Sequence, residues 1–153
     1  MGGPVSKRRP RDIGTAAESA VVRFLRAGGF PHAERRTLKG NLDQGDITGT
    51  PGICWEVKGG NAARNASDLL IDQWLAETEA ERVNARADIG VLVVQRAGIG
   101  PANAGRWWAI VPAGFFHGTT TGPACRLHLT ALVHLLRQAG YGEPFIDDLE
   151  GTA

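Results

Sequence analysis

The stretch that decides the fold is Gln44-Gly45-Asp46-Ile47-Thr48-Gly49-Thr50-Pro51-Gly52-Ile53-Cys54-Trp55-Glu56-Val57-Lys58. Two extended segments, at about 44–48 and 53–58, flank a Pro-Gly turn signal, and this pattern predicts an antiparallel hairpin. Alternate residues of a strand share one face. Ile53, Trp55 and Val57 therefore point into a core, whereas Cys54, Glu56 and Lys58 point the opposite way.

The register of this hairpin decides where the Asp46 carboxylate lies. With Thr50-Pro51-Gly52 as a three-residue loop, Asp46 is opposite Glu56, and their Cβ atoms are about 5 Å apart on one face. A two-residue loop would pair Asp46 with Val57 and turn the carboxylate toward the core, where an unpaired charge is costly. We therefore predict a three-residue loop or a bulge.

Asp46, Glu56 and Lys58 form a chemically informative set. Two carboxylates at that separation repel each other unless a cation lies between them. Oxygen ligands of this kind suit Mg²⁺ or Mn²⁺ better than Zn²⁺. Lys58, about 6.6 Å from Glu56 along the strand, could orient or deprotonate a water and stabilise charge on a phosphoryl transition state. The alternative is a turn aspartate next to a solvated strand face, whose surface charges contribute little.

The rest of the chain supplies helices and further strands in a defined order. We expect a helix at 15–27 with a Thr15-x-x-Glu18 capping box, and a helix from an N-cap at Ser67 to about Arg86. Extended segments are expected at 33–38, 89–95 and 107–111, a loop at 59–65, and a last helix at about 130–139. Helix, three strands, helix, two strands, helix predicts an α/β fold with a central mixed β-sheet flanked by helices.

Charge is distributed unevenly along the 153 residues, although the net charge is only +1. Residues 1–42 carry nine Lys or Arg against three acids, and the remainder is net acidic. This indicates a flexible basic arm at 1–11 and a single domain at 12–153, with the first part able to meet a polyanion. A solvated basic tail is the alternative.

Cysteine content and hydropathy restrict the setting of the chain. The 2 cysteines make no disulfide framework or metal knuckle. No apolar run approaches the ~20 residues that cross a bilayer, and no hydrophobic signal opens the sequence. We therefore expect no membrane contact and a cytoplasmic location with reduced thiols.

Four motifs together carry a family resemblance: Gly14-Thr15-Ala16-Ala17-Glu18, Arg35-Arg36, Asp43-Gln44-Gly45-Asp46-Ile47 and Glu56-Val57-Lys58. In order and spacing, over about residues 12–95, the sequence resembles the PD-(D/E)XK nuclease superfamily, and most closely the archaeal and phage type of Holliday junction resolvase. The resemblance implies a restriction-endonuclease-like core and a Mg²⁺- or Mn²⁺-dependent endonuclease. It further implies a homodimer that acts on branched, four-way DNA in a prokaryotic or phage-infected cell.

The resemblance also implies roles for single residues. Asp46 and Glu56 would be metal ligands, Lys58 the catalytic lysine, and Glu18 the helical glutamate near the metal, unless Glu18 only caps its helix. Asp43 would serve the turn or approach the metal from a loop, and Gln73 would face the site unless it faces solvent. Phosphate contacts are expected from a set of arginines: Arg8, Arg9, Arg11, Arg35, Arg36 and Arg64.

Other functions remain open at this point. The same chemistry could serve a repair, flap or restriction-type nuclease that acts on other DNA. A non-catalytic nucleic-acid-binding protein would use the carboxylates only structurally. Trp107 and Trp108 match none of the motifs, and we expect them in the core or in a dimer interface, because aromatic residues dominate the area of both.

Overall fold

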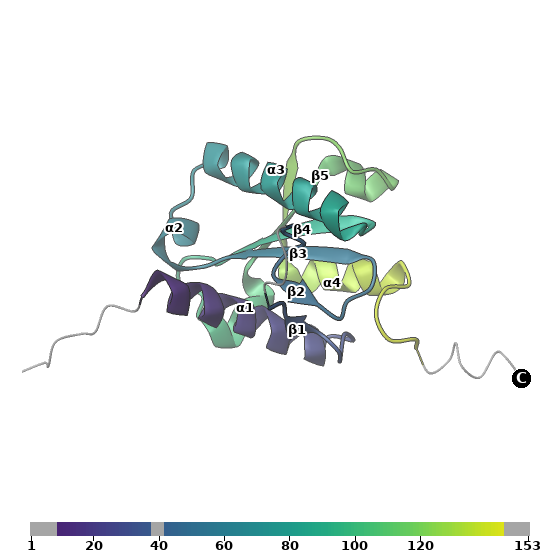
Figure 1. Ribbon diagram of the computed structural model, residues 1–153, viewed down its shortest axis with the longest axis horizontal. Helices are drawn as coiled ribbons and strands as arrows, with labels where there is room; N and C mark the ends of the chain where they lie inside the picture. The colour runs from purple at the N-terminus through teal and green to yellow at the C-terminus, as the bar shows by residue number, and fades with distance from the viewer. Residues whose placement is uncertain (1–8, 38–41, 146–153) are drawn as a thin grey trace, which may run out of the picture.

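The computed structural model, which describes residues 9–37 and 42–145, is organised around one six-stranded mixed sheet (Figure 1). Its strands lie side by side in chain order, and only β3 and β4 run parallel. They are β1 (Glu34–Arg35), β2 (Ile47–Thr48), β3 (Ile53–Lys58), β4 (Ile89–Val94), β5 (Trp108–Pro112) and β6 (Ala124–His128). The predicted α/β class with a central mixed sheet is confirmed.

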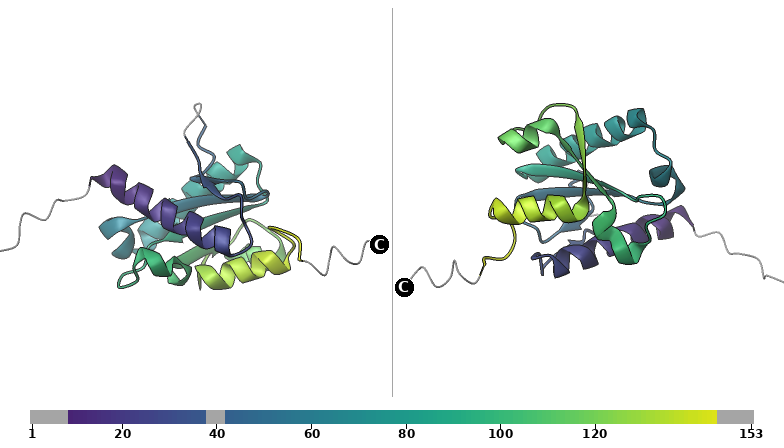
Figure 2. Two further views of the ribbon diagram at one scale, coloured as in Figure 1. Left: turned by 90° about the horizontal axis from the view of Figure 1, so that it is seen from below. Right: turned by 180° about the vertical axis from the view of Figure 1, so that it is seen from behind.

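Helices cover both faces of this sheet (Figures 1 and 2). On one face lie α1 (Pro10–Ala27) and α4 (Leu129–Gln138), and on the other lies α3 (Asp68–Ala85). The short helix α2 (Gly60–Arg64) follows β3, and the 3-10 helices η1 (Pro101–Arg106) and η2 (Ala113–His117) flank β5. Within the described ranges, none of the helices combines the length and the apolar character needed to cross a membrane.

The two faces of β3 are both covered, but by different surroundings. Ile53, Trp55 and Val57 join the larger apolar cluster with α1 and α4, as their alternation predicted. The Trp55 indole Nε1 donates a hydrogen bond of 3.0 Å to Thr50 Oγ1, which ties the strand to the hairpin turn. Cys54 and Glu56 point the other way and are buried beside α3. The alternative of a solvated strand face is therefore wrong for Glu56.

The first helix begins earlier than the sequence indicated. Because α1 starts at Pro10, Arg11 is helical rather than part of a flexible arm, and Thr15 lies inside the helix. The predicted capping box of Thr15 and Glu18 is therefore wrong. Asp12 in the first turn offers a physical reason for the early start, since a carboxylate there interacts favourably with the helix dipole.

The later elements are partly as expected. Ser67 is the N-cap of α3, as predicted, and its Oγ accepts a 3.1 Å hydrogen bond from the Leu70 N–H. The expected loop at 59–65 instead contains α2. The sequence analysis also missed β6, an edge strand that pairs with β5. Its two inward residues, Cys125 and Leu127, alternate with exposed ones and pack against the larger apolar cluster, so a short alternation was present in the sequence.

Candidate active site

The β2–β3 hairpin has the register that we predicted from a three-residue loop at Thr50-Pro51-Gly52. Ile47 pairs with Trp55, which is the register of a three-residue loop, and Asp46 immediately precedes this paired residue. The Asp46 N–H donates to the Trp55 carbonyl at 2.7 Å, and the Val57 N–H donates to Asp46 Oδ2, also at 2.7 Å. These two hydrogen bonds hold Asp46 against the backbone of β3, where the Glu56 charge acts on its carboxyl. Asp46 does not belong to the group of carboxylates whose oxygens lie within 4.8 Å of one another among the described residues.

Gly45 is the residue that permits this close approach. Its φ of +93° lies in the left-handed region that favours glycine. A Cβ at this position would lie 2.7 Å from the Trp55 carbonyl oxygen and 2.9 Å from Cys54 Sγ. The Gly-Asp pair of the motif therefore has a steric cause, because the loop before Asp46 packs directly on β3.

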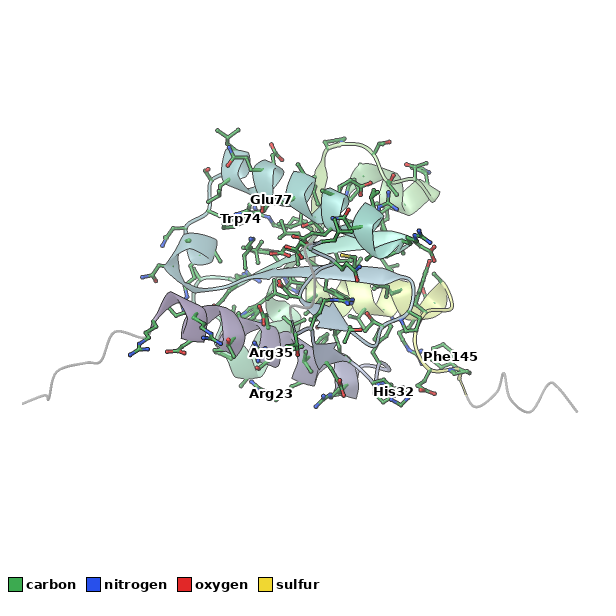
Figure 3. The ribbon with its side chains drawn as sticks, in the orientation of Figure 1. Arg23, His32, Arg35, Trp74, Glu77 and Phe145 are labelled. Atoms are coloured by element: carbon green, nitrogen blue, oxygen red, sulfur yellow. The ribbon has the colours of Figure 1, made fainter. Side chains whose placement is uncertain are left out.

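Lys58 lies among acidic and aromatic partners at the end of β3. Its Nζ is 3.1 Å from Glu56 Oε1, 3.7 Å from Glu77 Oε2 and 5.6 Å from the centre of the Trp74 ring. Figure 3 shows Trp74 and Glu77 on α3, above the sheet. Burial alone would lower the pKa of Lys58, but the carboxylates of Glu56, Glu77 and Asp46 raise it overall. The amine is therefore a charged ammonium at neutral pH.

A third carboxylate joins the site from α3. Asp43, Glu56 and Glu81 each offer an oxygen within 4.8 Å of the others. Glu81 was missed by the sequence reasoning, although a signal was present. It continues the spacing of Ile71, Trp74 and Thr78 along the buried stripe of α3, and a charged residue on such a stripe needs a partner.

Asp43 makes the turn contact that the sequence allowed, and its carboxylate also lies close to Glu56 and Glu81. Its Oδ1 accepts a 3.0 Å hydrogen bond from the Gly45 N–H, which is a turn contact. Its carbonyl oxygen accepts from Asn84 Nδ2 at 2.9 Å, which fixes the loop to α3. Together these contacts bring the Asp43 carboxylate to Glu56 and Glu81.

Negative charge is concentrated here beyond what the neighbouring side chains neutralise. Burial, followed by the Glu56 charge, raises the pKa of Asp46 to about 7, even though the Val57 hydrogen bond lowers it. Burial and contacts with Glu56 and Asp43 raise the pKa of Glu81 to about 10. Glu56 Oε2 and Glu81 Oε2 are buried without a hydrogen-bond partner among the described residues. The carboxylates of Asp43, Glu56 and Glu81 form an all-oxygen donor set that could hold a metal ion.

Glu18 lies on the other side of an open pocket that reaches Asp46. The pocket has a volume of about 660 Å³, and its lining includes three arginines and three acids: Arg11, Arg35, Arg36, Glu18, Asp43 and Asp46. Glu18 Oε2 accepts from Arg35 Nε at 2.9 Å, and Arg35 Nη2 donates to Thr15 Oγ1 at 3.2 Å. Glu18 thus faces the candidate site, and its ion pair orients Arg35 beside it.

The other predicted residues are placed as follows. Arg36 Nη1 donates to Gln44 Oε1 at 3.3 Å, and its buried Nε has no partner among the described residues. Arg9 is exposed at the start of α1, and Arg8 lies outside the described residues. Arg64, on α2, donates to Asn61 Oδ1 and borders a different pocket from Asp46. Gln73 is exposed on α3, one turn before Glu77.

Cys54 shares the face of Glu56 but is not a nucleophile. Burial, together with the Glu81 and Glu56 charges, raises the pKa of its thiol to about 12. Its Sγ donates to the Gln44 carbonyl at 3.4 Å. Cys54 therefore acts as a small packing residue under the loop, because a thiol with this pKa stays protonated and unreactive.

Comparisons with known proteins do not extend this description. No family model matches the sequence, and neither a curated protein nor a solved structure matches the chain.

Proposed function

We propose that this protein is a Mg²⁺- or Mn²⁺-dependent DNA endonuclease with a restriction-endonuclease-like core, of the Holliday junction resolvase type within the PD-(D/E)XK superfamily. The observation that carries the proposal is that Asp46, the residue before β2, is hydrogen-bonded to β3 next to Glu56, whose carboxylate is paired with Lys58. Glu56 is only 6% exposed, so its ion pair with Lys58 is not a solvated pair on the protein surface. The six-stranded mixed sheet between helices is compatible with that fold.

The carboxylates of Asp46 and Glu56 would hold the metal ion, with Glu81 and Asp43 adjoining Glu56 on the α3 side. A divalent cation bound there supplies a Lewis acid for phosphodiester hydrolysis. The Val57 N–H fixes Asp46 before any ligand arrives, so little ordering is needed on binding. One oxygen of Glu56 is paired with the Lys58 ammonium, and within residues 9–37 and 42–145 the other oxygen has no hydrogen-bond partner.

Lys58 acts as a charged donor rather than as a base in this proposal. In the metal-free protein the neighbouring carboxylates raise the pKa of Lys58, which favours the protonated ammonium and a role as a donor. A fixed cation at this point stabilises the negative charge that develops on the phosphoryl group. Of the roles suggested for Lys58 by the sequence, stabilisation of charge is therefore the one we propose.

In this proposal the DNA backbone binds in the arginine-lined pocket, which also borders Asp46. Three arginines border the pocket: Arg11 on α1, Arg35 on β1 and Arg36 directly after β1. Planar guanidinium groups suit phosphate oxygens, and such contacts position a duplex without reading its sequence. Recognition by shape therefore fits a junction substrate. One chain carries one such site, so paired nicks would require a two-fold dimer.

The test is the cleavage of a synthetic four-way junction in the presence of Mg²⁺ or Mn²⁺. We expect the wild-type protein to convert it into paired nicked duplexes, and Asp46→Asn and Glu56→Gln to abolish the cuts. Asp72→Asn is the matched control, because Asp72 is an exposed carboxylate on α3 outside the acidic cluster.

Three outcomes distinguish the functions that the sequence left open. An intact junction with folded wild-type protein and either metal refutes the proposal. Equal cleavage of linear and branched duplexes identifies a nuclease with a different substrate. Salt-sensitive DNA binding without metal-dependent cleavage identifies a DNA-binding protein without catalysis.

A further inference from the structure

One row of side chains crosses the sheet from Lys58 on β3 to the edge strand β6. In the strand register, Lys58 pairs with Val94, Val94 with Trp108, and Trp108 with His128. Directly paired residues project from the same face of a sheet, so this row lies on the α3 side. With strands ~4.8 Å apart, Trp108 is roughly 10 Å and His128 roughly 14 Å from the Lys58 position.

The far end of this row is not covered by α3. The helix packs on β3, β4 and, less extensively, β5. Arg126 and His128 on β6 are exposed, and Trp108 on β5 is half-buried. Trp108, Arg126 and His128 therefore continue, without a covering helix in the described part of the chain, the sheet face that carries Glu56 and Lys58. We call these three residues, together with the neighbouring Arg96, the Trp108 platform.

Two arginines stack on the one indole of this platform. The guanidinium carbons of Arg96 and Arg126 lie 4.3 Å and 5.2 Å from the centre of the Trp108 ring. Arg96 Nη1 is 3.2 Å from His128 Nε2, and the His128 ring lies 5.5 Å from that of Trp108. A guanidinium has only donors, so His128 Nε2 is the acceptor in this contact.

The charge of the Trp108 platform is unbalanced. Neither Arg96 nor Arg126 has a carboxylate within ion-pair distance in the part of the chain that the structure describes. Bringing two like charges to one ring costs free energy unless an anion offsets their repulsion. Stacking fixes the planes of both groups while leaving guanidinium N–H donors for such an anion.

We infer that the Trp108 platform binds the phosphodiester backbone of the DNA arm that leaves the site at Lys58. This inference rests on the proposed function and names the surface that holds its substrate. One DNA strand advances ~3.4 Å along the axis per nucleotide, so roughly 10–14 Å corresponds to about three or four nucleotides from the cut. Arg96 and Arg126 would then contact phosphates on a strand whose scissile bond lies near Lys58.

The test measures binding of a synthetic four-way junction as a function of salt, in EDTA so that no strand is cut. We expect the double variant R96Q/R126Q to bind roughly tenfold more weakly at moderate salt. The slope of log affinity against log salt should decrease by about 1.8, because each lost phosphate contact removes about 0.9. The charge reversal R126E alone should weaken binding in the same direction.

The matched control is Arg23→Gln, which removes the same charge from an exposed position on α1. Figure 3 places Arg23 on the side of α1 away from the sheet. Thermal unfolding of each variant establishes that it is folded. We expect the control to keep the wild-type affinity and slope.

The failures of the two proposals can be told apart. If wild-type protein cleaves junctions but R96Q/R126Q has the slope and affinity of the Arg23→Gln control, the platform inference is overturned and the proposed function stands. If the variants instead change only the oligomeric state, the platform is an interface between copies and the inference is again overturned. If wild-type protein neither binds nor cuts DNA, both are overturned.

Discussion

Neutralising Asp46 should stabilise the metal-free protein at alkaline pH while abolishing its activity. The pKa of this carboxyl is raised from 3.8 to about 7 by burial and by the Glu56 charge. The folded protein therefore keeps a proton that the unfolded chain releases near pH 4. This contribution to stability is fully present below about pH 4 and is lost as the pH rises through about 7.

The size of the effect follows from the width of that window. Each pKa unit corresponds to about 1.4 kcal/mol, so raising the pH from 5 to 8 removes roughly 3 kcal/mol from the folded wild-type protein. Asp46→Asn does not titrate, and its side-chain carbonyl can still accept from the Val57 N–H. Between pH 5 and pH 8, we therefore expect the free energy of unfolding of the variant to rise by roughly 3 kcal/mol relative to that of the wild type. That gain is about 6–12 °C in melting temperature for a chain of this size.

The assay is thermal unfolding at pH 5 and pH 8 in EDTA, repeated at pH 8 with Mn²⁺. Mn²⁺ should raise the melting temperature of the wild type, because a ligand that binds only the folded state stabilises it. Its effect on Asp46→Asn should be smaller, and Asp72→Asn should follow the wild type throughout. A melting-temperature difference between Asp46→Asn and wild type that is the same at both pH values would refute the reasoning, because no charge repulsion would then be released.

Four further outcomes are expected. Glu81→Gln should weaken Mn²⁺ binding by roughly tenfold or more in calorimetric titration, and unchanged affinity would remove Glu81 from the metal site. Lys58→Met should slow junction cleavage by roughly 10²–10³ while junction binding in EDTA stays intact; a rate within a few-fold of the wild type would contradict its role. Thr50→Val should lower the free energy of unfolding by about 1–3 kcal/mol in urea, since the Trp55 indole N–H loses its acceptor. Cys54 should resist a thiol reagent until the protein unfolds, and rapid labelling in the native state would disprove its burial and raised pKa.

Local patterns were sufficient for the central hairpin and for the long helix. The alternation of Ile53, Trp55 and Val57 and the turn at Thr50-Pro51-Gly52 together specified the register, because a slip of one residue would bury the Asp46 carboxylate in the apolar core. Ser67 marked the start of α3 in the same way, since an N-cap acts on the next three residues. These features depend on neighbours in the sequence.

Most of the features missed from the sequence depend on distant partners. The start of α1 had local signals, Pro10 at its first position and Asp12 in its first turn, that the sequence analysis did not use. The edge strand β6 is short, and its extended form depends on pairing with β5. Gln73 and Arg64 were chosen for positions that no local pattern could orient relative to the site. The Trp108 platform likewise joins residues from the loop after β4, from β5 and from β6.

The sequence by itself determined that Asp46, Glu56 and Lys58 lie close together, because a strand period of two and one tight turn leave few other arrangements. Only the tertiary structure decided that α3 covers this face and brings Glu81 and Asp43 to Glu56. Burial is the main cause of the raised pKa values of Asp46 and Glu81. Desolvation depends on everything packed around a group, and for Glu56 that packing comes from residues up to about 25 positions away in the chain.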